Sequence, residues 1–259
     1  MALTSASRRP ATPAPRRSNL WAPGRAAKGP FRGCGPALGG AHDSVSKVGE
    51  AVVMREMTIR IVAILAGLVL FGIGIGLLFL ADLGVAPWDI LHDALAKLLN
   101  HRPGTVLIVL GVPIAGLVML LRQPIGPATI ANTVIIGLVL DLVLAVVEPP
   151  STMATRVALM VAAPIVVGFG SMLYLGGALG IGVRDGLMTA LEDAGLSTRA
   201  ARTWIEASVV VIGGALGGTY GVGTLVFALA VGPSLQYFQR HVWAGFSEPP
   251  KWVYRRSRK

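Results

Sequence analysis

The chain has 259 residues, of which 53% are hydrophobic and only 14% are charged, and its mean hydropathy is +0.67. Soluble domains carry about 25% charged residues, so this composition excludes an ordinary soluble domain. The net charge of +10 lies at the two ends of the chain. Residues 1–57 hold nine Lys/Arg and three acids, and residues 240–259 hold six Lys/Arg and one acid, whereas residues 58–239 hold eight Lys/Arg and nine acids. Basic flanks around an apolar body are typical of membrane proteins, and no nucleic-acid-binding pattern accompanies them.

The sequence predicts no cofactor, no metal site and no enzyme activity. Its single cysteine, Cys34, has no partner for a disulfide, and no thiol cluster exists for zinc or iron–sulfur. The four histidines show no metal-ligand spacing, and no metalloprotease, nucleophile-elbow or phosphate-loop motif is present. We therefore expect a membrane protein that catalyses no reaction.

Residues 1–57 are predicted to form a disordered basic tail. Residues 1–50 are rich in Ala, Pro, Gly, Ser and Arg and contain no acid before Asp43, so they have too little apolar surface to offset the entropy of ordering. Three interpretations stay open: an extension upstream of a true start at Met54 or Met57, an organellar transit peptide, and a functional cytoplasmic tail.

The first membrane region is predicted over residues 58–148. It has apolar runs over 61–80, 105–121 and 130–147, which are long enough to span a bilayer. Between the first two, residues 85–100 form an amphipathic helix that is too short and too polar for an ordinary span. The helix either lies at the membrane interface or enters the membrane as a half-helix packed within protein. We expect its polar side, with Asp89, His92, Asp93 and Lys97, to be a solvated face.

The second membrane region is predicted over residues 154–239 and has the same layout. Its apolar runs cover 157–175, 203–216 and 222–238, and a short helix covers 186–194. A basic C-terminal tail, residues 240–259, follows. Three spans in each region give six in total, whereas eight result if the two short helices also cross the bilayer.

The two regions are related by an internal repeat. The stretch Leu83-Gly84-Val85-Ala86-Pro87-Trp88-Asp89 recurs 96 residues later as Leu179-Gly180-Ile181-Gly182-Val183-Arg184-Asp185. After a one-residue gap, residues 126–129 correspond to 221–224, and Asp141 corresponds to Gln236. Three spans in a copy would invert the second copy relative to the first. The predicted fold is an all-α integral membrane protein of two tandem, inverted repeats, each with about three spans and a short amphipathic helix.

These paired loops resemble the YczE-like branch of the YczE/YitT family of bacterial multi-pass membrane proteins. The stretches Gly221-Val222-Gly223-Thr224 and Gly232-Pro233 also resemble that family, and the resemblance covers about 58–239. Ala86 departs from the pattern, because the family has glycine there. The resemblance implies an integral plasma-membrane protein whose molecular activity is poorly defined.

Two aspartates are the leading candidates for a binding site. Asp89 and Asp185 each follow a glycine-bearing loop and begin a short helix. One interpretation is that they cap the free amides of these helices; the other is that they form a site for a cation or polar solute between the repeats. Asp141 is a third candidate, because an ionisable group within an apolar run is costly and by default a functional candidate; the alternative is a structural role in hydrogen bonding.

The remaining candidates are polar residues and loop glycines. Asn132 and Gln236 complete the hypothetical substrate-binding set, and Gly84, Gly180 and Gly182 are the loop glycines. Arg202 and Glu206 are four residues apart, which predicts a structural ion pair on one helix face.

The sequence predicts a transporter or permease-like protein for an unidentified small solute or ion, in the plasma membrane with both termini cytoplasmic. The alternative is a non-transporting scaffold or accessory protein that stabilises a partner through glycine-rich helix faces. The predicted partners are the lipid bilayer and either a small solute or another membrane protein, and a homo-oligomer is left open.

Overall fold

The computed structural model describes residues 39–123, 126–177, 179 and 182–243. Contacts divide the chain into the units 1–47 and 48–259, and the second unit contains both of the predicted membrane regions. The described residues are all-α and include no strand. Helix α1 begins at Gly39, inside the stretch that the sequence predicts to be disordered, while residues 1–38 and most of the C-terminal tail lie outside the described residues.

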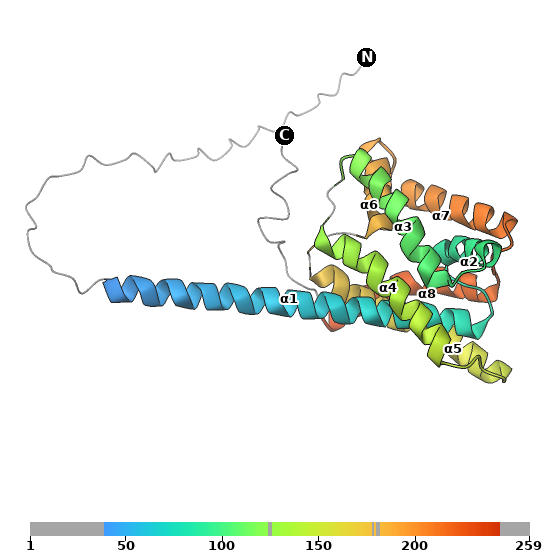
Figure 1. The fold of residues 1–259 in the computed structure, drawn as a ribbon, viewed down its shortest axis with the longest axis horizontal. Coiled ribbons are helices and arrows are strands. Elements are labelled where there is room, and N and C mark those ends of the chain that lie inside the picture. Colours follow the sequence, from blue (N-terminus) through green and yellow to red (C-terminus); the bar gives the residue numbers. More distant parts are fainter. Residues whose placement is uncertain (1–38, 124–125, 178, 180–181, 244–259) are drawn as a thin grey trace, which may run out of the picture. The chain divides into compact units, whose positions relative to one another are not determined.

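Eight helices form the described fold (Figure 1). They are α1 (Gly39–Ala81), α2 (Pro87–Leu99), α3 (Pro103–Leu120), α4 (Pro127–Val146), α5 (Met153–Gly176), α6 (Val183–Asp193), α7 (Thr198–Ala215) and α8 (Val222–His241).

Four of the described helices are long and apolar enough to cross a membrane, namely α1 over Val53–Ala81, α3, α4 over Ala128–Val146, and α5. Helices α2 and α6 have 13 and 11 residues, and a span needs about 20. Helices α7 and α8 are as long as α3 and α4 but more polar, since they include Arg202, Glu206 and Arg240. The prediction of an all-α membrane protein is confirmed.

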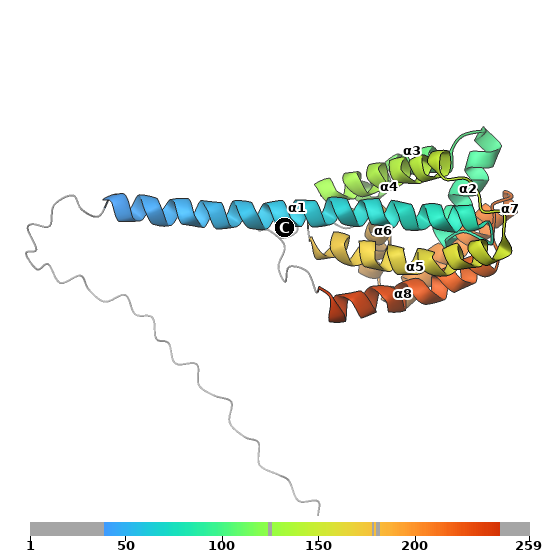
Figure 2. The same ribbon diagram turned by 90° about the horizontal axis from the view of Figure 1, so that it is seen from below.

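Helix α1 lies between two pairs of helices, with α3 and α4 on one side and α5 and α8 on the other (Figure 2). Glycines make this close packing feasible. A methyl group at Gly72 would lie 2.8 Å from Cβ of Val139 on α4, and one at Gly67 would lie 2.6 Å from the carbonyl oxygen of Gly170 on α5. The backbones of α1 and α5 are therefore in direct contact, as small-residue faces allow in membrane helices.

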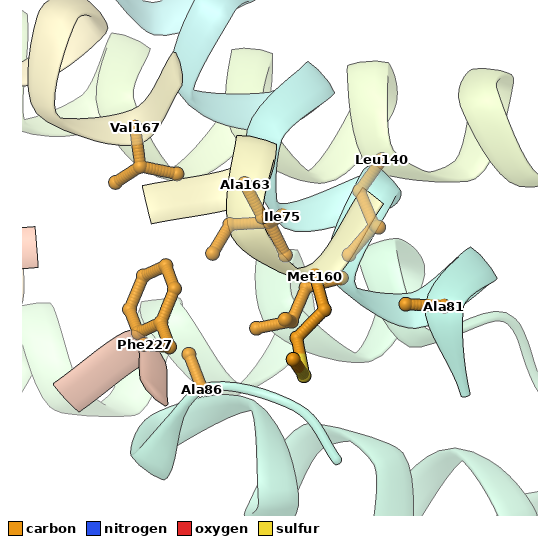
Figure 3. Close-up of a cluster of buried hydrophobic side chains, with 9 residues drawn as sticks. Ile75, Ala81, Ala86, Leu140, Met160, Ala163, Val167 and Phe227 are labelled. Carbon is orange, nitrogen blue, oxygen red and sulfur yellow. The ribbon is translucent and has the colours of Figure 1, made fainter. Parts of the chain in front are cut away.

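The apolar core lies where these helices meet (Figure 3). It contains Ile75, Leu78 and Ala81 from α1, Leu140 from α4, Met160, Ala163 and Val167 from α5, Phe227 from α8, and Ala86 before α2. Large apolar side chains such as Val109, Leu120 and Leu229 point outward and are more than 60% exposed. Outward apolar faces of this extent suit a lipid environment.

Each short helix packs against one helix of the other half of the chain, α2 against α7 and α6 against α3, and also against the helix that follows it, α3 and α7 respectively. The expectation that the polar side of α2 faces solvent holds for Lys97, which is exposed, but is wrong for the other three residues. Asp89, His92 and Asp93 are only 0%, 2% and 7% exposed, whereas Leu98 and Leu99 are both 60% exposed. Asp93 accepts hydrogen bonds from the amide of Thr219 (2.7 Å), in the link between α7 and α8, and from Lys97 on α2 itself (2.7 Å), so its carboxylate is paired within the protein.

The contact between α1 and α5 predicts the effect of one methyl group. Gly170→Ala places Cβ 2.6 Å from the carbonyl oxygen of Gly67 and 2.8 Å from the amide nitrogen of Phe71, so the two backbones must separate. We expect a loss of about 1–3 kcal/mol of stability, measured by thermal or denaturant unfolding in detergent. The matched control is Gly116→Ala on α3, where a methyl group meets no atom within 4 Å; it should be neutral or stabilising through helix propensity. Equal effects of both substitutions would contradict the packing argument.

Candidate functional site

A cavity of about 250 Å³ lies between the two halves of the chain, at the N-terminal ends of α2 and α6. Its wall is mostly apolar, but polar side chains reach it from both halves. Residues before 150 contribute Trp88, His92, Asn132 and Thr133. Residues after 150 contribute Ser171, Tyr174, Arg184, Asp185, Arg202 and Glu206. Concave sites with a few polar groups in an apolar wall are the usual form of small-molecule sites.

A buried ion pair joins the two short helices behind the cavity wall. Asp89 is fully buried, and its Oδ1 lies 3.3 Å from Nη2 of Arg184 and 2.9 Å from Nδ1 of His92. The guanidinium of Arg184 also lies over the ring of Trp88, 5.2 Å from its centroid, a distance suited to a cation–π interaction. Asp89 therefore does not cap α2; it holds an arginine from the other half of the chain.

The charge states in this cluster follow from burial and pairing. Burial would raise the pKa of Asp89, but Arg184 and the hydrogen bond from His92 outweigh it and hold that pKa below its usual value of 3.8. Burial lowers the pKa of His92 below 6.5, against the opposing effect of Asp89. At neutral pH the cluster consists of a carboxylate, a guanidinium and a neutral imidazole whose Nδ1–H donates to Asp89.

Asp185 has a different environment from that of Asp89. It is exposed to the cavity from the first turn of α6 and accepts a hydrogen bond from the backbone of Gly182, the residue before the helix. This bond is the one the capping interpretation predicts. Desolvation by the surrounding protein raises the pKa of Asp185 above 3.8, although Arg184 and Arg202 act to lower it.

Arg202 and Glu206 form the predicted ion pair on α7. Nε of Arg202 lies 2.8 Å from Oε1 of Glu206. Both residues also line the cavity, so the pair contributes to its electrostatics as well as to the helix. Because Glu206 neutralises Arg202, the two residues together add no net charge to the cavity wall.

Asp141 and Gln236 lie away from the cavity. Asp141 accepts hydrogen bonds from the amide of Gly104 (2.7 Å) and the hydroxyl of Thr105 (2.7 Å). These two residues are in the first turn of α3, so Asp141 caps that helix from α4. Gln236 is exposed on α8. Of the hypothetical binding set, Asp185 and Asn132 line the cavity and Asp89 lies directly behind it.

Two of the three loop glycines can be placed. Gly84 has φ +113°, and a Cβ there would lie 2.6 Å from the amide nitrogen of Gly221, so both conformation and space require glycine. Gly182 precedes α6 and lines the cavity. Gly180 lies outside the described residues.

Sequence reasoning missed Arg184, His92, Trp88 and Tyr174 as site residues. A signal for Arg184 was present, since it stands in the second loop where the first loop has Trp88. A charge beside an apolar span at a position otherwise aromatic indicates a polar partner. Tyr174 gave no such signal, because an aromatic residue near the end of a span is ordinary at a membrane interface.

Comparisons with known proteins agree with this architecture. A family model described as "Family of unknown function (DUF6198)" matches residues 58–240. The chain is 33% identical over 176 residues to an uncharacterized protein of Haemophilus influenzae, covering 68% of this chain and 81% of that one. It is 27% identical over 188 residues to the uncharacterized membrane protein YczE of Bacillus subtilis, covering 71% and 86%. No solved structure matches. The resemblance to YczE-like proteins is confirmed.

Removing the guanidinium of Arg184 should reverse the pH dependence of stability. In the native protein the depressed pKa of Asp89 contributes stability above pH 3.8 that is lost as pH falls through the folded-state pKa. The depressed pKa of His92 makes stability fall as pH drops below 6.5, because only the unfolded chain takes up that proton. In Arg184→Gln, the buried pair of an Asp89 carboxylate and a neutral His92 has one negative charge without a counterion. Binding one proton makes the pair neutral overall, so lower pH should stabilise this variant.

We therefore expect Arg184→Gln to be less stable by about 3 kcal/mol at pH 8 and to gain stability between pH 8 and 6. Thermal unfolding in detergent measures both effects. The double variant Asp89→Asn/Arg184→Gln is the control, and it should recover much of the loss because no charge is left unpaired. A pH profile of Arg184→Gln parallel to that of the native protein would contradict the proposed pairing.

Proposed function

We propose that this chain, which belongs to the family of unknown function DUF6198, is a membrane transporter for a small solute or ion, with its binding site in the cavity between two inverted repeats. The observation that carries the proposal is the composition of the cavity wall. Corresponding positions of the two repeats line it together: Phe71 with Val167, Ala86 with Gly182, Trp88 with Arg184, His92 with Met188, and Ile136 with Val231. Transporters built from inverted repeats bind their substrates at the repeat interface.

The helix boundaries support the repeat. Helices α3 and α7 both have 18 residues and begin 95 positions apart, and α4 and α8 both have 20 residues at the same offset. The first turns agree as well, since Thr129 and Thr224 accept hydrogen bonds from the amides of Gly126 and Gly221.

The contact between α1 and α5 supports an inverted arrangement. A Cβ at Gly170 would lie 2.8 Å from the amide nitrogen of Phe71, and one at Gly74 would lie 3.0 Å from that of Val167. In the repeat, Gly74 corresponds to Gly170 and Phe71 to Val167. Paired contacts that exchange corresponding residues are expected at a twofold axis, and the residue numbers run in opposite directions along the two helices.

Arginines at corresponding positions of the same two helices repeat this pattern. Arg60 on α1 donates to the carbonyl oxygen of Gly177 at the end of α5 (3.4 Å), and Arg156 on α5 reaches Asp82 just after α1 (3.4 Å). Arg156 stands 96 positions after Arg60. Each arginine thus contacts the C-terminal end of the other helix, where a positive charge is favourable.

The short helices exchange partners in the same way. A methyl group at Gly213 on α7 would lie 2.8 Å from the carbonyl carbon of Ile90 on α2, and one at Gly186 on α6 would lie 2.8 Å from Cγ1 of Val118 on α3. Gly213 corresponds to Val118, and Ile90 to Gly186. Each short helix therefore packs on the third helix of the other repeat, and the cavity lies between these two contacts.

The alternative function, a scaffold that binds a partner through glycine-rich faces, has less support. The glycines on which it depends are used within the chain, because Gly67, Gly72 and Gly76 on α1 contact α5 and α4, and Gly168 on α5 contacts Ser234 on α8. A scaffold also has no need of a polar cavity at the repeat interface.

The inverted arrangement predicts the sides of two corresponding links. In a Cys34→Ser background, His101→Cys in the link between α2 and α3 should react with an impermeant thiol reagent on intact cells. Ser197→Cys, in the link between α6 and α7, should react only after permeabilisation. Protection of both cysteines would mean parallel copies and would contradict the inverted repeat.

Transport itself predicts that the cavity opens to both sides of the membrane. In the same background, Ser171→Cys, which replaces one small side chain of the cavity wall, should react with an impermeant thiol reagent in right-side-out and in inverted vesicles. The matched control Ser151→Cys, in the link between α4 and α5, should react in only one of the two preparations. Reaction of Ser171→Cys from one side alone, or from neither, would exclude alternating access and favour the scaffold.

A further inference from the structure

We propose that the cavity contains a site for one monovalent cation, formed by Asp185, Tyr174 and Asn132 around Gly182. The proposal deepens the function proposed above, since it names the charge class that the same cavity binds. It is tested by binding rather than by transport, so the two can fail separately.

Three oxygen atoms from three helices converge beside Gly182. A methyl group at Gly182 would lie 3.1 Å from Oδ2 of Asp185 on α6, 3.4 Å from Oη of Tyr174 on α5 and 3.8 Å from Oδ1 of Asn132 on α4. The space left by the missing side chain is thus bounded by a carboxylate, a phenol and an amide oxygen. All four residues line the cavity, so a ligand that enters the cavity can reach this point.

Among the residues that the structure describes, none forms a hydrogen bond with the phenol of Tyr174. Tyr174 is also only 4% exposed. A buried hydroxyl without a partner is costly, by about 1–3 kcal/mol, and such groups call for an explanation in terms of a ligand or an ordered water. A bound cation would take a lone pair of this oxygen as a ligand.

The charges around the cavity leave one negative charge unbalanced. Arg184 is paired with Asp89 and Arg202 with Glu206, while the lowered pKa of His92 keeps it neutral. Among the described residues that line the cavity or lie behind it, Asp185 is the carboxylate without an ion-pair partner. A single positive charge at Gly182 would complete the balance, and a divalent ion would exceed it.

The corresponding position in the first repeat is filled with apolar side chains. There Ala86 replaces Gly182, Leu78 replaces Tyr174 and Phe227 replaces Asn132. All three belong to the apolar core, where Ala86 and Phe227 lie next to each other (Figure 3). In one repeat this position has only apolar side chains, two of which, Ala86 and Phe227, also line the cavity, whereas in the other repeat it is lined by oxygens. Packing alone does not require the polar version, which supports a ligand for it.

The ligand chemistry is one positive charge held by three oxygens. No group of three or more His, Cys, Asp or Glu suited to a metal ion occurs among the described residues, and a single carboxylate suits neither a transition metal nor Ca²⁺. An alkali ion and the ammonium group of a small solute both fit, since each is stabilised by carboxylate, amide and phenol oxygens.

Protons compete for the same carboxylate. Arg184 on α6 and Arg202 on α7 face Asp185 and favour its ionised form, Tyr174 on α5 and Asn132 on α4 are neutral, and the charge of Glu206 is held by Arg202. Desolvation nevertheless raises the pKa of Asp185. Cation affinity should therefore increase as pH rises through this pKa and level off above it.

The test measures thermal unfolding of the purified full-length protein in detergent at constant ionic strength. Sodium chloride, potassium chloride and methylammonium chloride are titrated against tetraethylammonium chloride, which has no N–H donor and cannot bring its charge within 3 Å of an oxygen. We expect a saturable rise in unfolding temperature, larger at pH 8 than at pH 3.8, where protons occupy at least half of the Asp185 carboxylates because the pKa of Asp185 is raised above that value. A rise with an alkali ion identifies a metal ion, and a rise with methylammonium alone identifies an amine. Equal curves for all four salts would overturn the proposal.

Variants assign the effect to the site. Asp185→Asn should abolish the cation-dependent shift, Tyr174→Phe should weaken affinity about tenfold through loss of one ligand, and Gly182→Ala should block the position with a methyl group. The matched control is Asp82→Asn, which removes an exposed carboxylate paired with Arg156 outside the cavity and should keep the shift.

If Asp185→Asn fails to fold, the cation-dependent shifts of Tyr174→Phe and Gly182→Ala test the site instead. A full shift in both would overturn the site. A cation-dependent shift together with one-sided reaction of Ser171→Cys would support the cation site and reject the transporter. Reaction of Ser171→Cys from both sides without any cation-dependent shift would support the transporter and reject the cation site.

Discussion

The fold depends on the direct backbone contact between α1 and α5. Helices in a bilayer gain little from burying apolar surface against one another, because lipid is equally apolar, so they associate through close packing. Gly67 and Gly74 on α1 meet Gly170 and Ala163 on α5 at distances that leave no room for larger side chains. This contact fixes α1 in the centre of the second unit, with α4 on the face that carries Gly72 and Gly76. The cavity lies beside the contact, since Phe71 and Val167 belong to both.

Close packing brings two unequal charged loops together. Asp89 and Asp185 occupy the same position in their loops, yet one is buried against an arginine and the other faces the cavity. The difference arises from one neighbour, because the residue before Asp185 is Arg184 and the residue before Asp89 is Trp88. Arg184 pairs with Oδ1 of Asp89 and lies over Trp88, which leaves its own neighbour Asp185 without an ion pair. A symmetric pair of loops would have produced two identical sites.

Much of the fold was predictable from apolar run lengths and from the repeated loop. The short helices were recognised because the runs over 85–100 and 186–194 are too short and too polar to cross a bilayer, and Asp185 was selected by its place after a glycine loop. Periodicity could not show which side of α2 faces protein, because in a membrane the apolar side can face lipid while the polar side is buried. The same limit applies to Asp141: a carboxylate within an apolar run satisfies either a ligand or the free amides of α3, and only tertiary structure distinguishes them.

The combination of symmetric contacts and an asymmetric site agrees with the requirements of an inverted transporter. Two inverted repeats can exchange conformations, and the exchange turns an inward-open state into an outward-open one of similar energy. The backbone contacts of α1 with α5 and of the short helices suit this exchange, since each has a counterpart under the proposed repeat. The oxygens around Gly182 have none, because Ala86, Leu78 and Phe227 are the residues at the corresponding positions. A single polar site beside a symmetric interface would remain in place while access to it changes sides.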